Sequence, residues 1–319
     1  MYMAKFIQSK KDDKILAVCL LFHRITQVDE DEIGPDTNSS ISPKDFEKLI
    51  VDLSNGYSPF SLKELVTRVI KKQKLPQNFF VVTFDDGYYD TWEIAYPILA
   101  KYNVPATVYI TTGFVNNLTV SCEYQLAEWL KGQDKVHFEW EGKTYRWQFQ
   151  THEDRKACYL AVRKLIKPIT PSRRRELLGR IIRDDTIHTT YNDLFMKWEH
   201  VIELGHSPLI TIGAHTHSHP LLTSLSSQEI VAEIELSKNI LENKLGASVS
   251  HFSYPYGAVD EEIKSHLRML GFISGVTTVP RGISDYGIDV MAIPRVEITG
   301  ERLVRYKTLP ELIERCVYS

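Results

Sequence analysis

Short apolar segments alternate with amphipathic segments along most of this chain, and this alternation restricts the folds that it can form. The apolar segments have the length of buried strands, and the clearest are residues 15–22, 79–84, 106–112, 209–215, 250–257 and 273–278. Between them lie segments with helical periodicity, such as 42–57, in which Phe46, Leu49, Ile50 and Leu53 fall on one side. Repeated strand–helix units predict a mainly parallel sheet, which right-handed crossovers can close into a (β/α) barrel.

The segment from about residue 118 to residue 205 interrupts this alternation. Residues 136–149, VHFEWEGKTYRWQF, predict an aromatic hairpin that turns at Glu141 and Gly142. Residues 153–167 and 172–185 have the pattern of two charged helices, and the arginine-rich second one is most simply a solvated amphipathic helix. We therefore interpret residues 1–319 as one domain that carries an inserted hairpin and helical segment at about 118–205.

The composition is that of an ordinary globular protein, with 43% hydrophobic and 25% charged residues. A net charge of -3 gives no reason to expect nucleic acid or an anionic membrane as the main partner. The longest apolar run, residues 15–22, is too short for a transmembrane segment and lacks the flanks of a signal peptide. The four cysteines lack CxxC spacing, which favours reduced thiols. We expect a cytoplasmic protein, or one peripheral to a membrane.

Two adjacent carboxylates, Asp85 and Asp86, directly follow the apolar segment 79–84 and precede Gly87. Reactive residues of parallel α/β folds collect at the carboxyl ends of the strands, which is where these two aspartates fall. Because the strand alternation breaks where the chain turns at Gly87, both carboxylates can face the same side. Taken alone, an Asp–Gly pair after a strand is more often only a turn.

Three histidines, His215, His217 and His219, follow the apolar segment that begins at residue 209. Imidazole is a common ligand of zinc and similar divalent ions. If this segment forms a helical turn, His215 and His219 face the same way and His217 points elsewhere. Two imidazoles and one carboxylate would make a ligand set with an open position, the pattern of a catalytic metal site. The alternative for these histidines is a solvated polar loop.

Three motifs in one order resemble a known family. TFDDGY (83–88), HTHSHP (215–220) and FSYPYG (252–257) look like the motifs of the metal-dependent polysaccharide deacetylases, the NodB-homology group of carbohydrate esterase family 4. The resemblance covers about residues 15–114 and 195–300 and leaves out the inserted segment. It implies a deformed (β/α) barrel of the polysaccharide deacetylase type.

The resemblance also implies roles for the motif residues. Asp85 would be the general base, and Asp86, His215 and His219 would bind one divalent ion, with zinc expected first and nickel or cobalt as alternatives. In the family a backbone N–H of the third motif stabilises the oxyanion, and that position here is Tyr256. An ion bound to Asp86 would relieve the charge conflict between the two aspartates and leave Asp85 ionised.

Two positions depart from the family pattern. Ser253 stands where the third motif usually has an arginine that orients the base, and no histidine follows His266 to serve as the usual acid. His23 in LLFHRI is similar to the early acid histidine of a subgroup with a permuted barrel, so we expect it to be the general acid. Its alternative is a histidine with a purely structural role.

Arg295, in AIPRVEI, follows a late apolar segment and can replace the missing guanidinium beside Asp85. A surface ion pair with Glu297 is the equal alternative for this arginine. Asp289 and Glu297 are candidate partners for His23, and the sequence does not decide between them.

These residues favour a metal-dependent hydrolase that removes the N-acetyl group of an amino sugar. Its substrate would be a polysaccharide or an oligosaccharide or lipid-linked precursor in bacterial surface polysaccharide synthesis, with lipopolysaccharide or capsule as contexts. The alternatives are a catalytically silent carbohydrate-binding protein on the same fold and a metal-dependent phosphohydrolase. The second would normally need a further metal and more acidic ligands, and the sequence offers no obvious second set.

Overall fold

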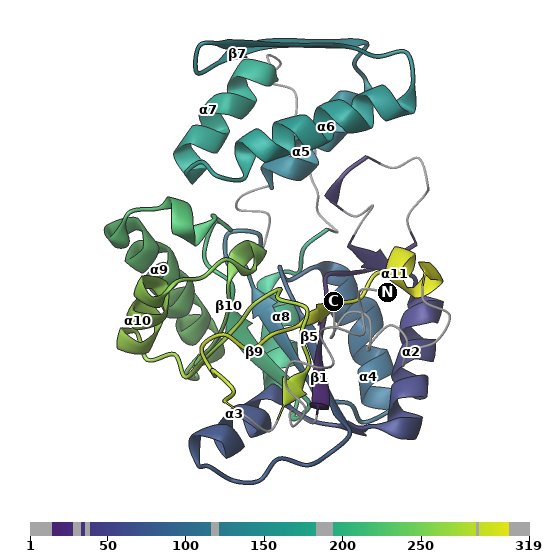
Figure 1. The fold of residues 1–319 in the computed structure, drawn as a ribbon, viewed down its shortest axis with the longest axis vertical. Helices are drawn as coiled ribbons and strands as arrows, with labels where there is room; N and C mark the ends of the chain where they lie inside the picture. The colour runs from purple at the N-terminus through teal and green to yellow at the C-terminus, as the bar shows by residue number, and fades with distance from the viewer. Residues whose placement is uncertain are drawn as a thin grey trace, which may run out of the picture.

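A computed structural model describes most of the chain (Figure 1), namely residues 15–27, 33–35, 39–115, 121–182, 194–284 and 287–305. Its centre is a nine-stranded sheet in the order β11-β10-β9-β6-β5-β1-β12, in which β13 also pairs with β1 and β4 with β5. All of these pairs are parallel except that of β1 with β12. The parallel sheet curls into a half-barrel with helices around it, which confirms the expected deformed (β/α) barrel.

The strands of this sheet are β1 (Ile15–Phe22), β4 (Ser58–Pro59), β5 (Phe79–Phe84), β6 (Ala106–Ile110), β9 (Ile210–Ala214), β10 (His251–Ser253), β11 (Ser274–Val276), β12 (Ile283–Ser284) and β13 (Val296–Glu297). A separate pair consists of β2 (Arg24–Ile25) and β3 (Ser40–Ile41). Every residue of β5 and β6 is buried, as expected for strands covered on both faces. The segment 15–22, which the sequence assigned to a buried strand, is β1.

The helices around the sheet are α2 (Pro43–Gly56), α3 (Leu62–Ile70), the π-helical turn η2 (Thr91–Ala95), α4 (Tyr96–Lys101), α8 (Trp198–His206), the 3₁₀ turn η4 (Leu222–Ser224), α9 (Ser227–Leu245), the 3₁₀ turn η5 (Pro255–Gly257), α10 (Glu261–Met269) and α11 (Gly300–Arg305). Ser42 caps α2 by accepting a hydrogen bond from the Asp45 amide, and the four apolar residues expected on one side of this helix are buried. Among the described helices, none is long and apolar enough to cross a membrane.

The inserted elements are α5 (Cys122–Lys131), β7 (Lys135–Trp140), β8 (Lys143–Gln148), α6 (His152–Ile166) and α7 (Pro171–Ile181). They gather at one end of the molecule in Figure 1 and have a hydrophobic cluster of their own, which includes Leu130, Phe138, Val162 and Leu177. The hairpin turns at Glu141 and Gly142 as expected, since both have positive φ, at 49° and 73°. The expected start of the insertion, near 118, lies outside the described residues, and its expected end, near 205, falls within α8.

The arginine-rich helix α7 is amphipathic, as expected, with Leu177, Leu178 and Ile181 on its buried side. One arginine departs from the expected solvated face, because Arg174 is only 6% exposed. Its neighbours Arg173 and Arg175 are exposed, as expected. The difference follows from helix geometry, since Arg174 lies on the side of α7 that also buries Leu177, Leu178 and Ile181. Within the described residues, Cys19, Cys122 and Cys158 are free thiols, while Cys316 lies outside them.

Candidate metal centre

Asp85 and Asp86 lie where β5 ends, and the chain turns sharply at this point. Asp86 already has a positive φ of 72°, and Gly87 follows with a φ of 85°. A Cβ on Gly87 would approach Ile110 Cδ1 to 3.2 Å, so a larger residue would be both strained and crowded. The turn therefore begins at Asp86, one residue earlier than the sequence suggested. Asp85 and Asp86 are both buried, at 2% and 8% exposure.

His215 and His219 follow β9, which is separated from β5 in the sheet by β6. The sequence brought these two histidines together through a helical turn, but residues 215–220 do not form a helix. Positive φ values at Thr216 (64°) and His219 (53°) reverse the chain instead. Thr216 Oγ1 accepts a hydrogen bond from the His219 amide and closes this reversal. The expected grouping is therefore present, for a different local reason.

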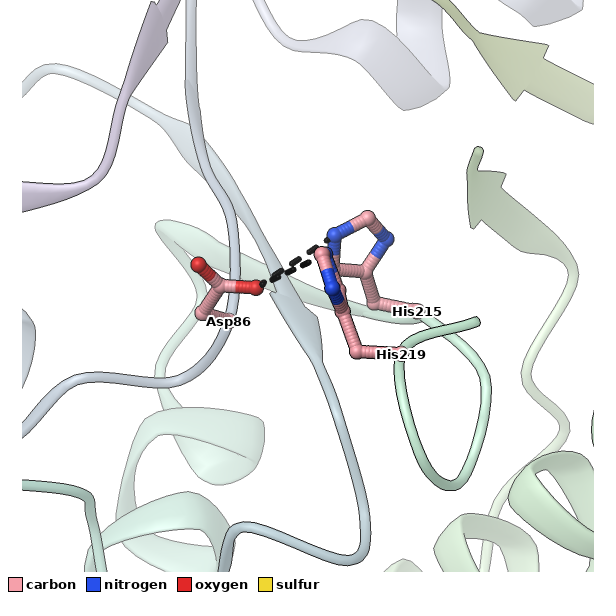
Figure 2. Close-up of side chains that lie close together, drawn as sticks. All are labelled: Asp86, His215 and His219. Atoms are coloured by element: carbon pink, nitrogen blue, oxygen red, sulfur yellow. Dashed lines mark ion pairs between the residues drawn. The ribbon is translucent and has the colours of Figure 1, made fainter. Parts of the chain in front are cut away.

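The side chains of Asp86, His215 and His219 point toward one another (Figure 2). Asp86 Oδ1 lies 3.5 Å from His215 Nε2 and 3.4 Å from His219 Nε2. One ligand atom from each of the three residues lies within 4.8 Å of the others. The buried Asp86 Oδ1 has no hydrogen-bond partner among the described residues. A carboxylate oxygen and two imidazole nitrogens arranged in this way fit the donor set of a zinc-type divalent ion.

The histidines are held in the form that binds metals. His215 Nδ1 lies 2.7 Å from the Ser253 carbonyl oxygen, which can only accept a hydrogen bond, so Nδ1 carries the proton and Nε2 keeps its lone pair. Burial, together with the neighbouring His215 imidazole and the positive charge of Arg174, lowers the pKa of His219 well below its usual value. His219 is therefore neutral at pH 7, as a metal ligand must be.

Asp85 forms a bidentate ion pair with Arg295. The guanidinium nitrogens lie 2.8 Å from Asp85 Oδ1 and 2.7 Å from Asp85 Oδ2, and Arg295 is fully buried. Burial alone would raise the pKa of Asp85, but the charge and hydrogen bonds of Arg295 outweigh it and hold that pKa far below its usual range. Asp85 is therefore ionised at pH 7.

Ser253, which stands where the family usually has an arginine, is part of this ion pair. Ser253 Oγ donates to Asp85 Oδ2 at 3.0 Å and accepts from Arg295 Nη2 at 2.9 Å. Arg295 also donates to Thr83 Oγ1 and to the Thr277 carbonyl oxygen. The guanidinium beside Asp85 thus comes from a late segment of the chain, and the alternative of a surface pair with Glu297 was wrong.

His23 follows β1, and its Nδ1 lies 3.5 Å from Glu297 Oε1 on the neighbouring strand β13. The other candidate partner, Asp289, pairs with Lys264 instead, at 2.7 Å. His23 directly follows Phe22, which pairs with Phe84 in the sheet, so His23 and Asp85 follow neighbouring strands at the same level. The His23 side chain is 21% exposed and is therefore open to solvent.

Tyr256 lies in η5, directly after β10, with a φ of 59°. Its ring is 4.8 Å from the ring of His219. Gly257 has a φ of 71°, and a Cβ there would come within 2.1 Å of Thr278 Oγ1, so this turn needs glycine. Tyr254, by contrast, is fully buried and donates to the Met291 carbonyl oxygen, which is a packing role.

His217 does not join the other two histidines. Its Nδ1 lies 3.0 Å from Thr112 Oγ1, and its amide donates to Glu233 Oε2 at 3.0 Å. Glu233, on α9, also accepts from the amide and the hydroxyl of Ser218. Glu233 was not identified from the sequence, although its place about two helical turns after the start of a capped helix could have suggested contact with the preceding loop.

Comparison with known proteins places the chain in a protein family. Residues 72–175 and 177–274 match the family model described as polysaccharide deacetylase. The Bacillus subtilis protein YxkH, named as a polysaccharide deacetylase, is 23% identical over 81% of this chain and 66% of its own length. The Staphylococcus aureus poly-beta-1,6-N-acetyl-D-glucosamine N-deacetylase is 36% identical over 36% of this chain and 37% of its own length. The matched segments thus cover about two thirds of the length of the first of these curated relatives and less than two thirds of the length of the second.

Solved structures share the fold. The deacetylase PplD of Streptococcus pyogenes, solved with acetate, has a TM-score of 0.59 at 18% identity, covering 91% of this chain and 97% of its own. IcaB of Ammonifex degensii has a TM-score of 0.59 at 19% identity, covering 92% of this chain and 95% of its own. At these identities the similarity concerns the arrangement of the backbone and carries no information about substrate.

Proposed function

Because the chain belongs to the polysaccharide deacetylase family, a group of hydrolases that act on amide bonds, we propose that it is a metal-dependent deacetylase that removes the N-acetyl group of an amino sugar. The observation that carries this proposal is the convergence of His215 Nε2 and His219 Nε2 on Asp86 Oδ1, a buried oxygen that lacks any other partner within the described residues. Asp85 adds an ionised carboxylate immediately beside this group.

Asp86, His215 and His219 would hold the divalent ion, with zinc expected first and nickel or cobalt as alternatives. When bound, such an ion supplies a Lewis acid that polarises a carbonyl group and lowers the pKa of a water molecule. The neutral state of His219 and the fixed tautomer of His215 support this role.

Asp85 is the proposed general base. Its Oδ2 lies 3.9 Å from His215 Nε2, so a water that reaches the ligand group is also within reach of this carboxylate. Arg295 and Ser253 fix both oxygens and keep the carboxylate ionised, which leaves it able to accept a proton. The same contacts prevent Asp85 from turning away, so its orientation is set before the substrate binds.

His23 and Tyr256 complete the proposed catalytic group. Glu297 Oε1, 3.5 Å from His23 Nδ1, would accept from that nitrogen and orient the imidazole once His23 is protonated, and the remaining nitrogen would donate a proton to the leaving amine. The left-handed backbone of Tyr256 turns the chain directly beside His219, where its N–H can donate to the developing oxyanion. A strained backbone of this kind is typical of groups that must meet a ligand in one orientation.

The proposed substrate is an N-acetylated polysaccharide, or an oligosaccharide or lipid-linked precursor, in bacterial surface polysaccharide synthesis. Support comes from the Staphylococcus aureus relative, whose name gives poly-beta-1,6-N-acetyl-D-glucosamine as its substrate. Short N-acetylglucosamine oligomers with β-1,6 and β-1,4 linkages are therefore the first compounds to test for acetate release.

Metal content and acetate release together test the proposal. We expect a single divalent ion per wild-type chain by elemental analysis, and its loss in Asp86→Ala and His215→Ala, because each variant lacks a ligand. Asp85→Asn should retain the ion and lose acetate release by a factor of at least about 100, since it lacks the base.

Two outcomes would contradict the proposal. Wild-type protein that stays free of metal after incubation with zinc, cobalt and nickel would exclude the hydrolytic mechanism. Protein that binds the ion and the oligomers but releases no acetate, with or without Asp85, would identify a carbohydrate-binding protein on this fold. His200→Gln is a suitable control, because its imidazole caps α8 and stacks on Trp92 away from the ligand group.

A further inference from the structure

Arg174, on the inserted helix α7, binds four backbone carbonyl oxygens. Its Nε donates to Ile166 and Ile169 at 3.1 Å each, and its Nη2 donates to Lys167 at 3.1 Å. These three carbonyls lie at the end of α6 and in the turn that follows, where helix carbonyls lose their normal partners. A single buried guanidinium therefore closes the junction between α6 and α7.

The fourth contact of Arg174 leaves the insertion. Its Nη1 donates to the carbonyl oxygen of His219 at 2.9 Å. His219 belongs to the ligand group and has a positive φ of 53°, a conformation that non-glycine residues adopt only when their surroundings hold it. Thr216 Oγ1 holds the amide of this residue, so Arg174 and Thr216 fix the peptide groups on both sides of His219.

The insertion approaches the same region at a second point. Lys167, in the junction that Arg174 closes, places its Nζ 4.6 Å from the centre of the Tyr256 ring. The Tyr256 ring in turn packs against the ring of His219 at 4.8 Å. The junction between α6 and α7 thus touches His219 through its carbonyl oxygen and through the ring beside it.

We propose that Arg174 is a positioning residue for the metal centre: it holds His219 in the orientation in which Nε2 faces Asp86, and so makes metal affinity depend on the inserted segment. This inference rests on the metal centre proposed above. It gives the insertion a role in the metal centre, because the proposed ligand His219, which follows the insertion in the chain, is held by a side chain within the insertion.

The charge of Arg174 makes the inference easy to test. Removing a positive charge near a divalent cation should by itself strengthen binding of that cation. If Arg174 positions His219, its removal should instead weaken binding, because the ligand is then free to leave its strained conformation. The two effects have opposite signs, so the direction of the change distinguishes them.

The test is Co²⁺ titration of the metal-free full chain, followed by visible absorption, for wild type and Arg174→Met. Methionine keeps much of the length and the apolar packing but donates no hydrogen bond. We expect Co²⁺ affinity to fall by at least about tenfold, in line with other groups that orient metal ligands. In the metal-free protein, hydrogen exchange of the segment 215–221 should become several-fold faster.

Two control variants separate positioning from general damage. Arg175→Met removes the same charge from an exposed position on the same helix, and it should bind Co²⁺ at least as tightly as wild type. Val162→Ala removes two methyl groups from the core of the insertion without touching the carbonyl cluster, and its affinity should stay within about threefold of wild type if α6 and α7 remain protected from exchange.

Wild-type affinity in Arg174→Met would overturn the inference, and so would an equal loss in Val162→Ala with α6 and α7 still protected. These results differ from failure of the proposed metal centre, in which the wild type itself would bind no Co²⁺. They also do not depend on the substrate, since no step of the test measures activity.

Discussion

At the scale of single residues, the ion pair between Asp85 and Arg295 shows how a catalytic arrangement constrains stability. Both side chains are almost fully buried, at 3% and 0% exposure, so each charge depends on the other for compensation. Such a pair adds little to stability compared with well-packed apolar residues, but removal of one partner leaves an uncompensated charge in the interior. The pair is therefore better explained by the orientation of Asp85 than by the stability of the fold.

We expect Arg295→Met to lower the free energy of unfolding by about 3–5 kcal/mol, because the buried charge of Asp85 is then no longer compensated by the guanidinium. The double variant Arg295→Met with Asp85→Asn should recover part of this loss, since the charge that Arg295 compensated is also removed. Urea denaturation followed by circular dichroism measures both values. A double variant no more stable than Arg295→Met alone would mean that packing around Arg295, and not its charge, accounts for the loss.

The sequence could predict the grouping of the residues in short motifs, because Asp85 and Asp86 directly follow one buried strand and His215 and His219 lie in the loop after another. It could not decide the partner of Arg295 or of His23, since both depend on which late strands lie beside β1. The inward position of Arg174 could have been predicted, because it shares helical spacing with Leu177, Leu178 and Ile181. Its contact with the carbonyl of His219 could not, because that contact depends on how the insertion packs in the tertiary structure.

At the scale of elements, α9 supports the loop of residues 215–220, which carries the three histidines, through one carboxylate. Glu233 accepts hydrogen bonds from the amides of His217 and Ser218 at 3.0 and 2.9 Å, while its helix begins at a capping box formed by Ser226 and Glu229. The loop itself lacks regular structure, so its backbone donors need such partners. The position of the ligands thus depends on a helix that supplies no ligand.

We expect Glu233→Ala to open this loop at least roughly tenfold more often, because a hydrogen bond to a charged group contributes about 1.5–3 kcal/mol. Hydrogen exchange of the His217 and Ser218 amides measures the change. Glu235→Ala is the matched control, since Glu235 is an exposed glutamate on the same helix. Equal exchange in the two variants would show that the loop does not depend on Glu233.

Most elements could be predicted from periodicity, including the strands β1, β5, β6 and β9 and the inserted hairpin. The helix α5 was not predicted, although Ser121 caps it and Tyr124, Ala127 and Leu130 are buried at helical spacing. It was missed because it lies between the barrel and the hairpin, outside the repeated strand–helix units from which the other helices were identified. The brief strands β12 and β13 carry too few residues to show any period.

At the scale of the whole molecule, the chain has separate hydrophobic clusters for the barrel and for the insertion. The main cluster joins the inner strands to the helices around them, while the insertion packs residues such as Leu126, Phe138 and Leu177 among themselves. A division of this kind allows one part to open while the other stays folded. Arg174 is one of the described links between them, through the carbonyl of His219.

We expect Leu177→Ala to lower the free energy of unfolding of the insertion by about 2–5 kcal/mol, because truncation of this fully buried side chain leaves a cavity. Faster hydrogen exchange should appear in α5, α6, α7 and the hairpin and should be absent from β5 and β6. Leu160→Ala, at an exposed position of α6, is the control. Faster exchange that extended equally to the central strands would show that the two clusters unfold as one unit.

The left-handed residues of the centre have a consequence for how such a chain can change. Asp86, Thr216, His219 and Tyr256 all have positive φ, which costs roughly 1 kcal/mol or more at each non-glycine residue. A library of variants selected for heat resistance alone would therefore favour glycine at these positions and discard the side chains that the chemistry needs. If selection for activity ceased, substitutions at these four positions would be among the first to accumulate, and they would stabilise the fold while they removed the site.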